Sequence, residues 1–67
     1  MVTYELDIWR VRFGNASLVS TKIYENKELA FEHASRVKTT KGVKVTVTEF
    51  RQESHYRRII FIKDKEC

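Results

Sequence analysis

The side chains most suited to metal binding or nucleophilic catalysis are few and far apart in this 67-residue chain. His33, His55 and Cys67 are its only imidazoles and its only thiol, and they lack the closely spaced ligand pairs of a zinc site. Ser54 directly precedes His55, but neighbouring residues of a strand point to opposite faces, which prevents a serine–histidine hydrogen bond. The sequence therefore predicts no metal, no cofactor and no catalytic residue.

The carboxylates and glycines offer no second route to an enzyme. Glu5 and Asp7 are the one acidic pair near apolar residues, where burial could shift a pKa for acid–base work. Gly14 and Gly42 are the only glycines, too few for a phosphate-binding loop. We expect a protein that is not an enzyme and has no small-molecule substrate.

Two clusters combine arginine with aromatic residues, one near the beginning of the chain and one near its end. Proteins that bind nucleic acids use arginine and lysine for phosphates and flat aromatic rings for bases. The net charge of +4 permits such binding without requiring it, and ordinary strands also carry aromatics for packing and arginines for solubility. The candidate nucleic-acid-binding residues are Arg10, Arg12, Arg57 and Arg58.

Part of the chain resembles the arm-binding domains of phage-type integrases. The resemblance rests on the run Ile8–Gly14, the strand after it and the stretch Asn26–Ala30, and it covers residues 1–38. It implies a small sheet that lies in a DNA groove and is backed by one helix. The chain departs from that family because the family has three strands before its helix and lacks a second hairpin.

One amphipathic helix, predicted over residues 26–38, organises the chain. Asn26 is the expected N-cap, and Ala30 and Ala34 at the centre of the apolar face would let the helix lie close to a sheet. His33 lies at the edge of that face and is expected to be a hydrogen-bonded boundary histidine. At 100° per residue, the apolar face contains Leu29, Ala30, Phe31, Ala34 and Val37.

Four strands complete the prediction, an α+β fold of order ββαββ with a mainly antiparallel sheet and one helix on one face. Gly14-Asn15 is the expected two-residue turn of the first hairpin, which would pair Phe13 with Ala16. The apolar run Ile59–Ile62 favours a central place in the sheet for the last strand. The strands are expected over residues 3–13, 16–24, 43–51 and 55–63, with a frayed tail at 64–67.

The predicted sheet has more apolar surface than one helix can cover. In the Gly14-Asn15 register, the face that the helix covers would hold Tyr4, Leu6, Ile8, Val19 and Ile23. The opposite face would hold Trp9, Val11, Phe13, Leu18 and Tyr24, with Phe50 and either Ile59 or Ile60. A bulge near Ile8-Trp9 would instead turn Trp9 inward. Exposed apolar patches of this size usually mark association surfaces. The candidate partner or dimer surface is Trp9, Val11, Phe13 and Leu18.

Composition limits the remaining possibilities. A single domain this short is marginally stable alone, and its one cysteine, Cys67, allows no disulfide within the chain and suits a reducing compartment. No apolar run has the length of a signal peptide or a membrane span, so we expect a cytoplasmic protein without membrane contact. In size and style the chain resembles small accessory proteins of phages and mobile elements. We therefore expect a homodimeric protein-binding module that inhibits or adapts a host protein, with nucleic-acid binding as the alternative.

Overall fold

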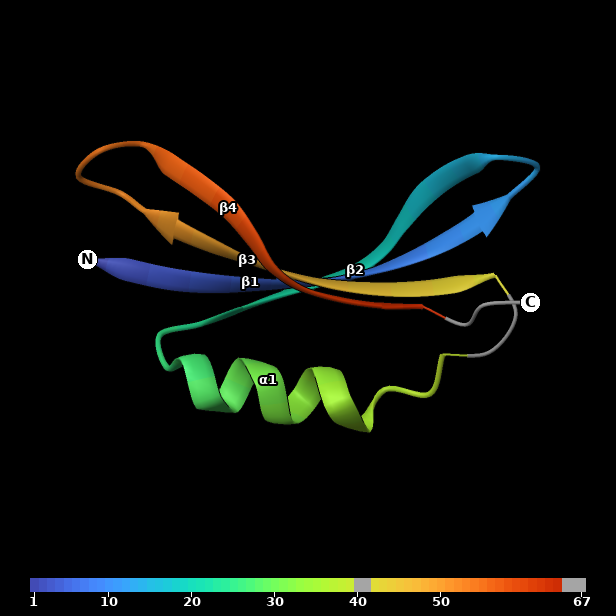
Figure 1. Cartoon of the computed structure of the whole chain (residues 1–67), viewed down its shortest axis with the longest axis horizontal. Helices are drawn as coiled ribbons and strands as arrows, with labels where there is room; N and C mark the ends of the chain where they lie inside the picture. The colour runs from blue at the N-terminus through green and yellow to red at the C-terminus, as the bar shows by residue number, and fades with distance from the viewer. Residues whose placement is uncertain (40–41, 65–67) are drawn as a thin grey trace.

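In the described part of the chain, four antiparallel strands form one sheet, and a single helix lies on one of its faces (Figure 1). The computed structural model describes residues 1–39 and 42–64. The strand order is β2-β1-β3-β4, which confirms the predicted α+β, ββαββ fold. Thr40, just beyond the helix predicted over residues 26–38, and most of the predicted tail, including Cys67, lie outside the described residues. The elements are β1 (Val2–Arg12), β2 (Asn15–Tyr24), α1 (Lys27–Arg36), β3 (Val43–Arg51) and β4 (Tyr56–Asp64).

Helix α1 packs on the sheet through its two small residues. Ala30 and Ala34 are fully buried, as predicted, because side chains of one carbon let the helix approach β1 and β3 closely. The residues of the sheet that complete this core are Leu6, Val45 and Val47, and all three are buried.

The ends of α1 are held by side chains. The Asn26 carboxamide oxygen accepts hydrogen bonds from the amides of Glu28 and Leu29, at 2.8 and 3.3 Å, so the predicted N-cap is confirmed. The helix ends at Arg36, two residues earlier than expected, because Val37 has an extended backbone. Lys63 on β4 donates to the carbonyl oxygens of Ser35 and Val37, both at 3.0 Å. A cation therefore lies at the negative end of the helix.

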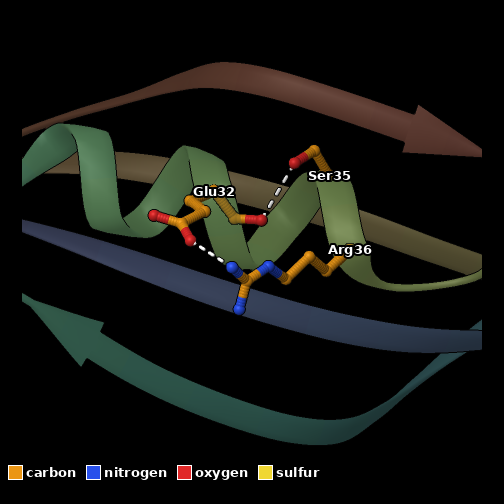
Figure 2. Close-up of polar contacts among 3 residues, drawn as sticks. All are labelled: Glu32, Ser35 and Arg36. Carbon is orange, nitrogen blue, oxygen red and sulfur yellow. Dashed lines mark hydrogen bonds and ion pairs between the residues drawn. The ribbon is translucent and has the colours of Figure 1, made fainter.

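The exposed side of α1 carries an i,i+4 ion pair between Glu32 and Arg36 (Figure 2). Arg36 reaches back to the Glu32 carboxylate, and the Ser35 hydroxyl donates to the Glu32 carbonyl oxygen at 2.9 Å. Such exposed pairs contribute only about 0.3–0.5 kcal/mol. The packing of the two alanines therefore contributes more to the position of α1 than this pair does.

The last strand lies at an edge of the sheet, so the prediction of a central place for it is wrong. Strand β1 is central instead, since it pairs with both β2 and β3. The run Ile59–Ile62 is accommodated by a bulge: Thr48 pairs with Ile59 and Val47 pairs with Phe61, which leaves Ile60 unpaired. Ile60 and Phe61 both pack against the core, so a continuous apolar run does not here mark a strand buried on both faces.

The first hairpin turns at Phe13-Gly14, so the predicted turn at Gly14-Asn15 is wrong. Arg12 pairs with Asn15, and Phe13 and Gly14 have φ values of 52° and 80°. Turns with two positive φ values favour glycine at the second central position, which is where Gly14 now lies. Phe13 is therefore a turn residue, and its predicted pairing with Ala16 is replaced by a pairing of Val11 with Ala16.

A bulge in β2 changes which β2 residues face the helix. Ile8 pairs with Ser20 and Trp9 pairs with Leu18, so Val19 is the extra residue. The alternation of β1 is unbroken, and Trp9 is not turned inward. Beyond the bulge, Ile23 pairs with Glu5 on the face away from α1, and Tyr24 pairs with Tyr4 on the face toward it. The predicted faces of Ile23 and Tyr24 are therefore both wrong.

Candidate interaction surface

The sheet face opposite α1 is hollowed. The β1–β2 and β3–β4 hairpins rise from opposite ends of the sheet on the side away from the helix (Figure 1). Between them lies a hollow of about 500 Å³. All four strands contribute to its lining, which includes Trp9, Asp7, Ala16, Thr46 and Ile59. The twist that raises the hairpins is the ordinary right-handed twist of a sheet.

The strand register arranges this helix-free face in rows across β2, β1, β3 and β4. The two central strands supply carboxylates and threonines, whereas the two edge strands supply mainly leucine and isoleucine. The face therefore has a polar floor between apolar edges. Its three central rows are Leu18–Trp9–Lys44–Asp64, Thr21–Asp7–Thr46–Ile62 and Ile23–Glu5–Thr48–Ile59.

Hydrogen bonds order the polar floor. The Thr21 hydroxyl donates to the Asp7 carboxylate at 2.8 Å, and the Trp9 indole Nε1–H donates to the Thr46 hydroxyl at 3.0 Å. Asp7 and Thr46 are only 6% and 5% exposed. Trp9 lies on the helix-free face, as predicted, and its polar edge is bonded to the floor.

Glu5 and Asp7, the acidic pair singled out from the sequence, lie in adjacent rows of the floor. Burial raises the pKa of Glu5 above its ordinary value, and the negative charge of Asp7 and a hydrogen bond between the two carboxyl groups raise it further. Arg57, which also lines the hollow, partly opposes this increase in pKa. The pair can accept hydrogen bonds and hold a proton.

The apolar edges of the face are open to solvent. Leu18 and Ile23 on β2 are 54% and 61% exposed, and Ile59 and Ile62 on β4 are 55% and 58% exposed. Four large aliphatic side chains exposed on one sheet face favour a binding role for that face. The sequence prediction placed Leu18 here but missed Ile23 and Ile62, because the bulges that decide their direction leave no mark on hydrophobic alternation.

The predicted partner surface is largely brought together. Trp9 pairs with Leu18, and Val11 pairs with Ala16, on the helix-free face. Phe13 lies apart from them at the tip of the hairpin, where its side chain is fully exposed.

The four arginines proposed for nucleic-acid binding do not form one patch. Arg10 and Arg12 alternate with Trp9 and Val11 along β1, so they face the other way. At the far hairpin, the Arg57 guanidinium stacks over the ring of Phe50 at 4.9 Å. Arg58 lies 4.0 Å from the Glu49 carboxylate, on the opposite face from Arg57.

His33 has the structural role that the sequence predicts for it. The Tyr24 hydroxyl and His33 Nδ1 are 2.7 Å apart, which confirms a hydrogen-bonded boundary histidine. Among residues 1–39 and 42–64, no three His, Cys, Asp or Glu side chains are placed to hold a metal ion. Over the same residues, no helix is long and apolar enough to cross a membrane.

No protein-family model, curated protein or solved structure matches this chain.

Proposed function

We propose that this chain is a non-enzymatic protein-binding module that uses its helix-free face. The observation that carries the proposal is the exposure of four large aliphatic side chains, Leu18, Ile23, Ile59 and Ile62, on the edges of one sheet face. Covering them removes apolar area from water, which is favourable at about 25 cal/mol per Å². Another protein surface is the ordinary cover for such a face.

The charges of the hollow favour protein over nucleic acid. Its floor carries the carboxyl groups of Glu5 and Asp7, which repel phosphate groups. The four candidate arginines lie at two separate hairpins and face different ways. The net charge of +4 supports the alternative of nucleic-acid binding, but that charge is not concentrated on the one hollowed face.

A module of this kind acts by occupying a surface of its partner. It can block a binding site or connect two proteins without any reactive group of its own. This is the role expected of a small accessory protein that inhibits or adapts a host protein.

The proposal is tested by capture of proteins from a lysate of candidate host cells on the immobilised chain, after nuclease digestion. Ile62→Asp places a charge on the exposed edge of the helix-free face, whereas Leu29→Asp places the same charge on exposed helix α1. Leu29 is a matched control because it is 51% exposed and lies in the first helical turn, where an acidic residue is tolerated.

The parent and Leu29→Asp should retain the same protein, and Ile62→Asp should lose it. Binding should change little between low and high salt, since apolar burial is not screened. Retention that disappears with nuclease, or that falls steeply with salt, would favour the nucleic-acid alternative.

A further inference from the structure

We infer that the helix-free face binds the same face of a second copy of this chain, which forms a two-sheet sandwich with both helices outside. The inference rests on the proposed function: in the free chain the surface binds a second copy, which a host protein that uses the same face displaces. Its evidence is the shape of the face, the order of charges in its rows and the size of the sheet.

The shape of the face suits a symmetric contact. The sheet is a saddle, raised at the two hairpin ends and lower between them (Figure 1). A two-fold axis between two copies can place their sheets face to face, because both sheets have the same twist. Aligned sheets pack in this way in β-sandwiches. Such an axis makes the contact self-complementary, so each residue pair occurs twice.

The carboxylates decide the direction of the axis. A two-fold axis across the strands would place β1 over β1 of the second copy, bringing Glu5 and Asp7 close to the same carboxylates. An axis along the strands, between β1 and β3, places β1 over β3 of the second copy. Like charges in contact repel, so the second arrangement is favoured.

The favoured axis gives the accessible carboxylate a hydroxyl opposite it. Glu5 faces Thr48 of the second copy, since these residues share a row in one sheet. Asp7 and Thr46 are only 6% and 5% exposed and are already hydrogen-bonded within their own chain, so they lie beneath the contact. Trp9 faces Lys44 of the second copy, a pairing that suits an ammonium group and an indole ring.

The same axis covers the exposed edges. It places β2 over β4 of the second copy, so that Ile23 lies over Ile59 of the second copy. These two isoleucines are 61% and 55% exposed in the single chain. One arrangement therefore pairs Glu5 with a hydroxyl and covers part of both apolar edges.

The size of the sheet allows a dimer with a modest interface. The chain measures 37 × 22 × 17 Å, and the helix and sheet stack along the middle axis in Figure 1. The face therefore extends over at most 37 by 17 Å, a footprint of up to about 600 Å² per copy, which reaches the lower end of stable protein interfaces.

The test uses charge compensation across the axis. Ile23→Lys and Ile59→Glu should each weaken the dimer about tenfold or more, measured by analytical ultracentrifugation over a concentration series. The double variant Ile23→Lys/Ile59→Glu should recover much of that loss. Within one chain the two residues lie on opposite edges, separated by β1 and β3, so recovery can arise only between copies.

A second measurement uses the parent chain and needs no substitution. In a mixture of ¹³C-labelled and unlabelled chains, isotope-filtered NOEs should connect the methyl groups of Ile23 and Ile59. Circular dichroism should first show that each variant is folded.

Three results would overturn the inference. The first is a parent that is monomeric at millimolar concentration. The second is a double variant whose loss of dimer affinity equals the sum of the two single losses, and the third is a dimer that lacks these NOEs. A monomeric parent that still captures a lysate protein through Ile62 would leave the proposed function standing. If the dimer forms as inferred but Ile62→Asp captures the same lysate protein as the parent, the dimer stands and the proposed function fails.

Discussion

Trp9 donates its indole Nε1–H to the hydroxyl of Thr46 over 3.0 Å, which links β1 to β3 on the sheet face opposite α1. Thr46 pairs in register with Asp7, not with Trp9, so this bond runs diagonally from one row of the sheet to the next. The bond orients a large apolar ring at the edge of a polar floor. It gives the helix-free face a defined shape before any partner binds.

Thr46→Val should therefore destabilise the chain by about 1 kcal/mol, because valine has a similar volume but cannot accept the indole hydrogen. Urea unfolding would measure the loss, and Trp9 fluorescence should shift as the ring loses its partner. Thr48→Val is the matched control, two residues along the same strand and on the same face. Equal effects of the two substitutions would show that the indole bond contributes nothing specific.

Ala34→Leu should destabilise the fold by about 1–3 kcal/mol, because the added carbons must enter a closely packed contact between α1 and the sheet. Ala34 is fully buried, which leaves no route for the larger side chain to solvent. Thermal unfolding checks the prediction, with the exposed Ser35→Ala as a control that should change the melting temperature little. An unchanged melting temperature for Ala34→Leu would place the tight contact elsewhere on α1.

Glu5→Gln should alter the pH dependence of stability. Because the folded-state pKa of Glu5 is raised above 4.5, the folded chain holds that proton more tightly than the unfolded chain does. The stability from protonated Glu5 is fully present below pH 4.5 and is lost as pH rises through the raised pKa.

The free energy of unfolding, measured with urea, should therefore differ between the parent and Glu5→Gln by an amount that changes from pH 4.5 up to the raised pKa of Glu5. Above that pKa the difference should level off. At pH 7 the variant should be at least as stable as the parent, since an amide carries no charge to bury. All samples need the same protein concentration, because association also affects stability. A difference that stays constant from pH 4 to 8 would contradict the raised pKa.

Arg10→Ala and Arg12→Ala together should leave protein capture unchanged after nuclease digestion, because both side chains face away from Trp9. The double variant should also keep the fold, since Arg10 is exposed on the sheet and Arg12 is exposed at the hairpin end. Retention on immobilised DNA or RNA gives the second readout. If the parent is retained there and the folded double variant is not, the alternative of nucleic-acid binding gains the stronger support.

Local sequence determined the identity of the elements. Asn26 predicts the helix start because its side chain can cap free amides, and the spacing of Ala30 and Ala34 predicts the face that packs on the sheet. The alternation of Val43, Val45 and Val47 likewise predicts β3. Each of these signals lies within a few residues, so it survives without knowledge of the rest of the fold.

Only the tertiary structure decided which strand is central and which side chains share the hollowed face. Strand order depends on pairing between distant segments, and the apolar run of β4 was a poor guide once Ile60 was accommodated in a bulge. The bulge at Val19 moved Ile23 outward and Tyr24 inward, whereas the turn at Phe13-Gly14 shifted the register by two residues and left the faces unchanged. A single inserted residue reverses the direction of every side chain beyond it, so the composition of a sheet face follows from register, which periodicity alone does not specify.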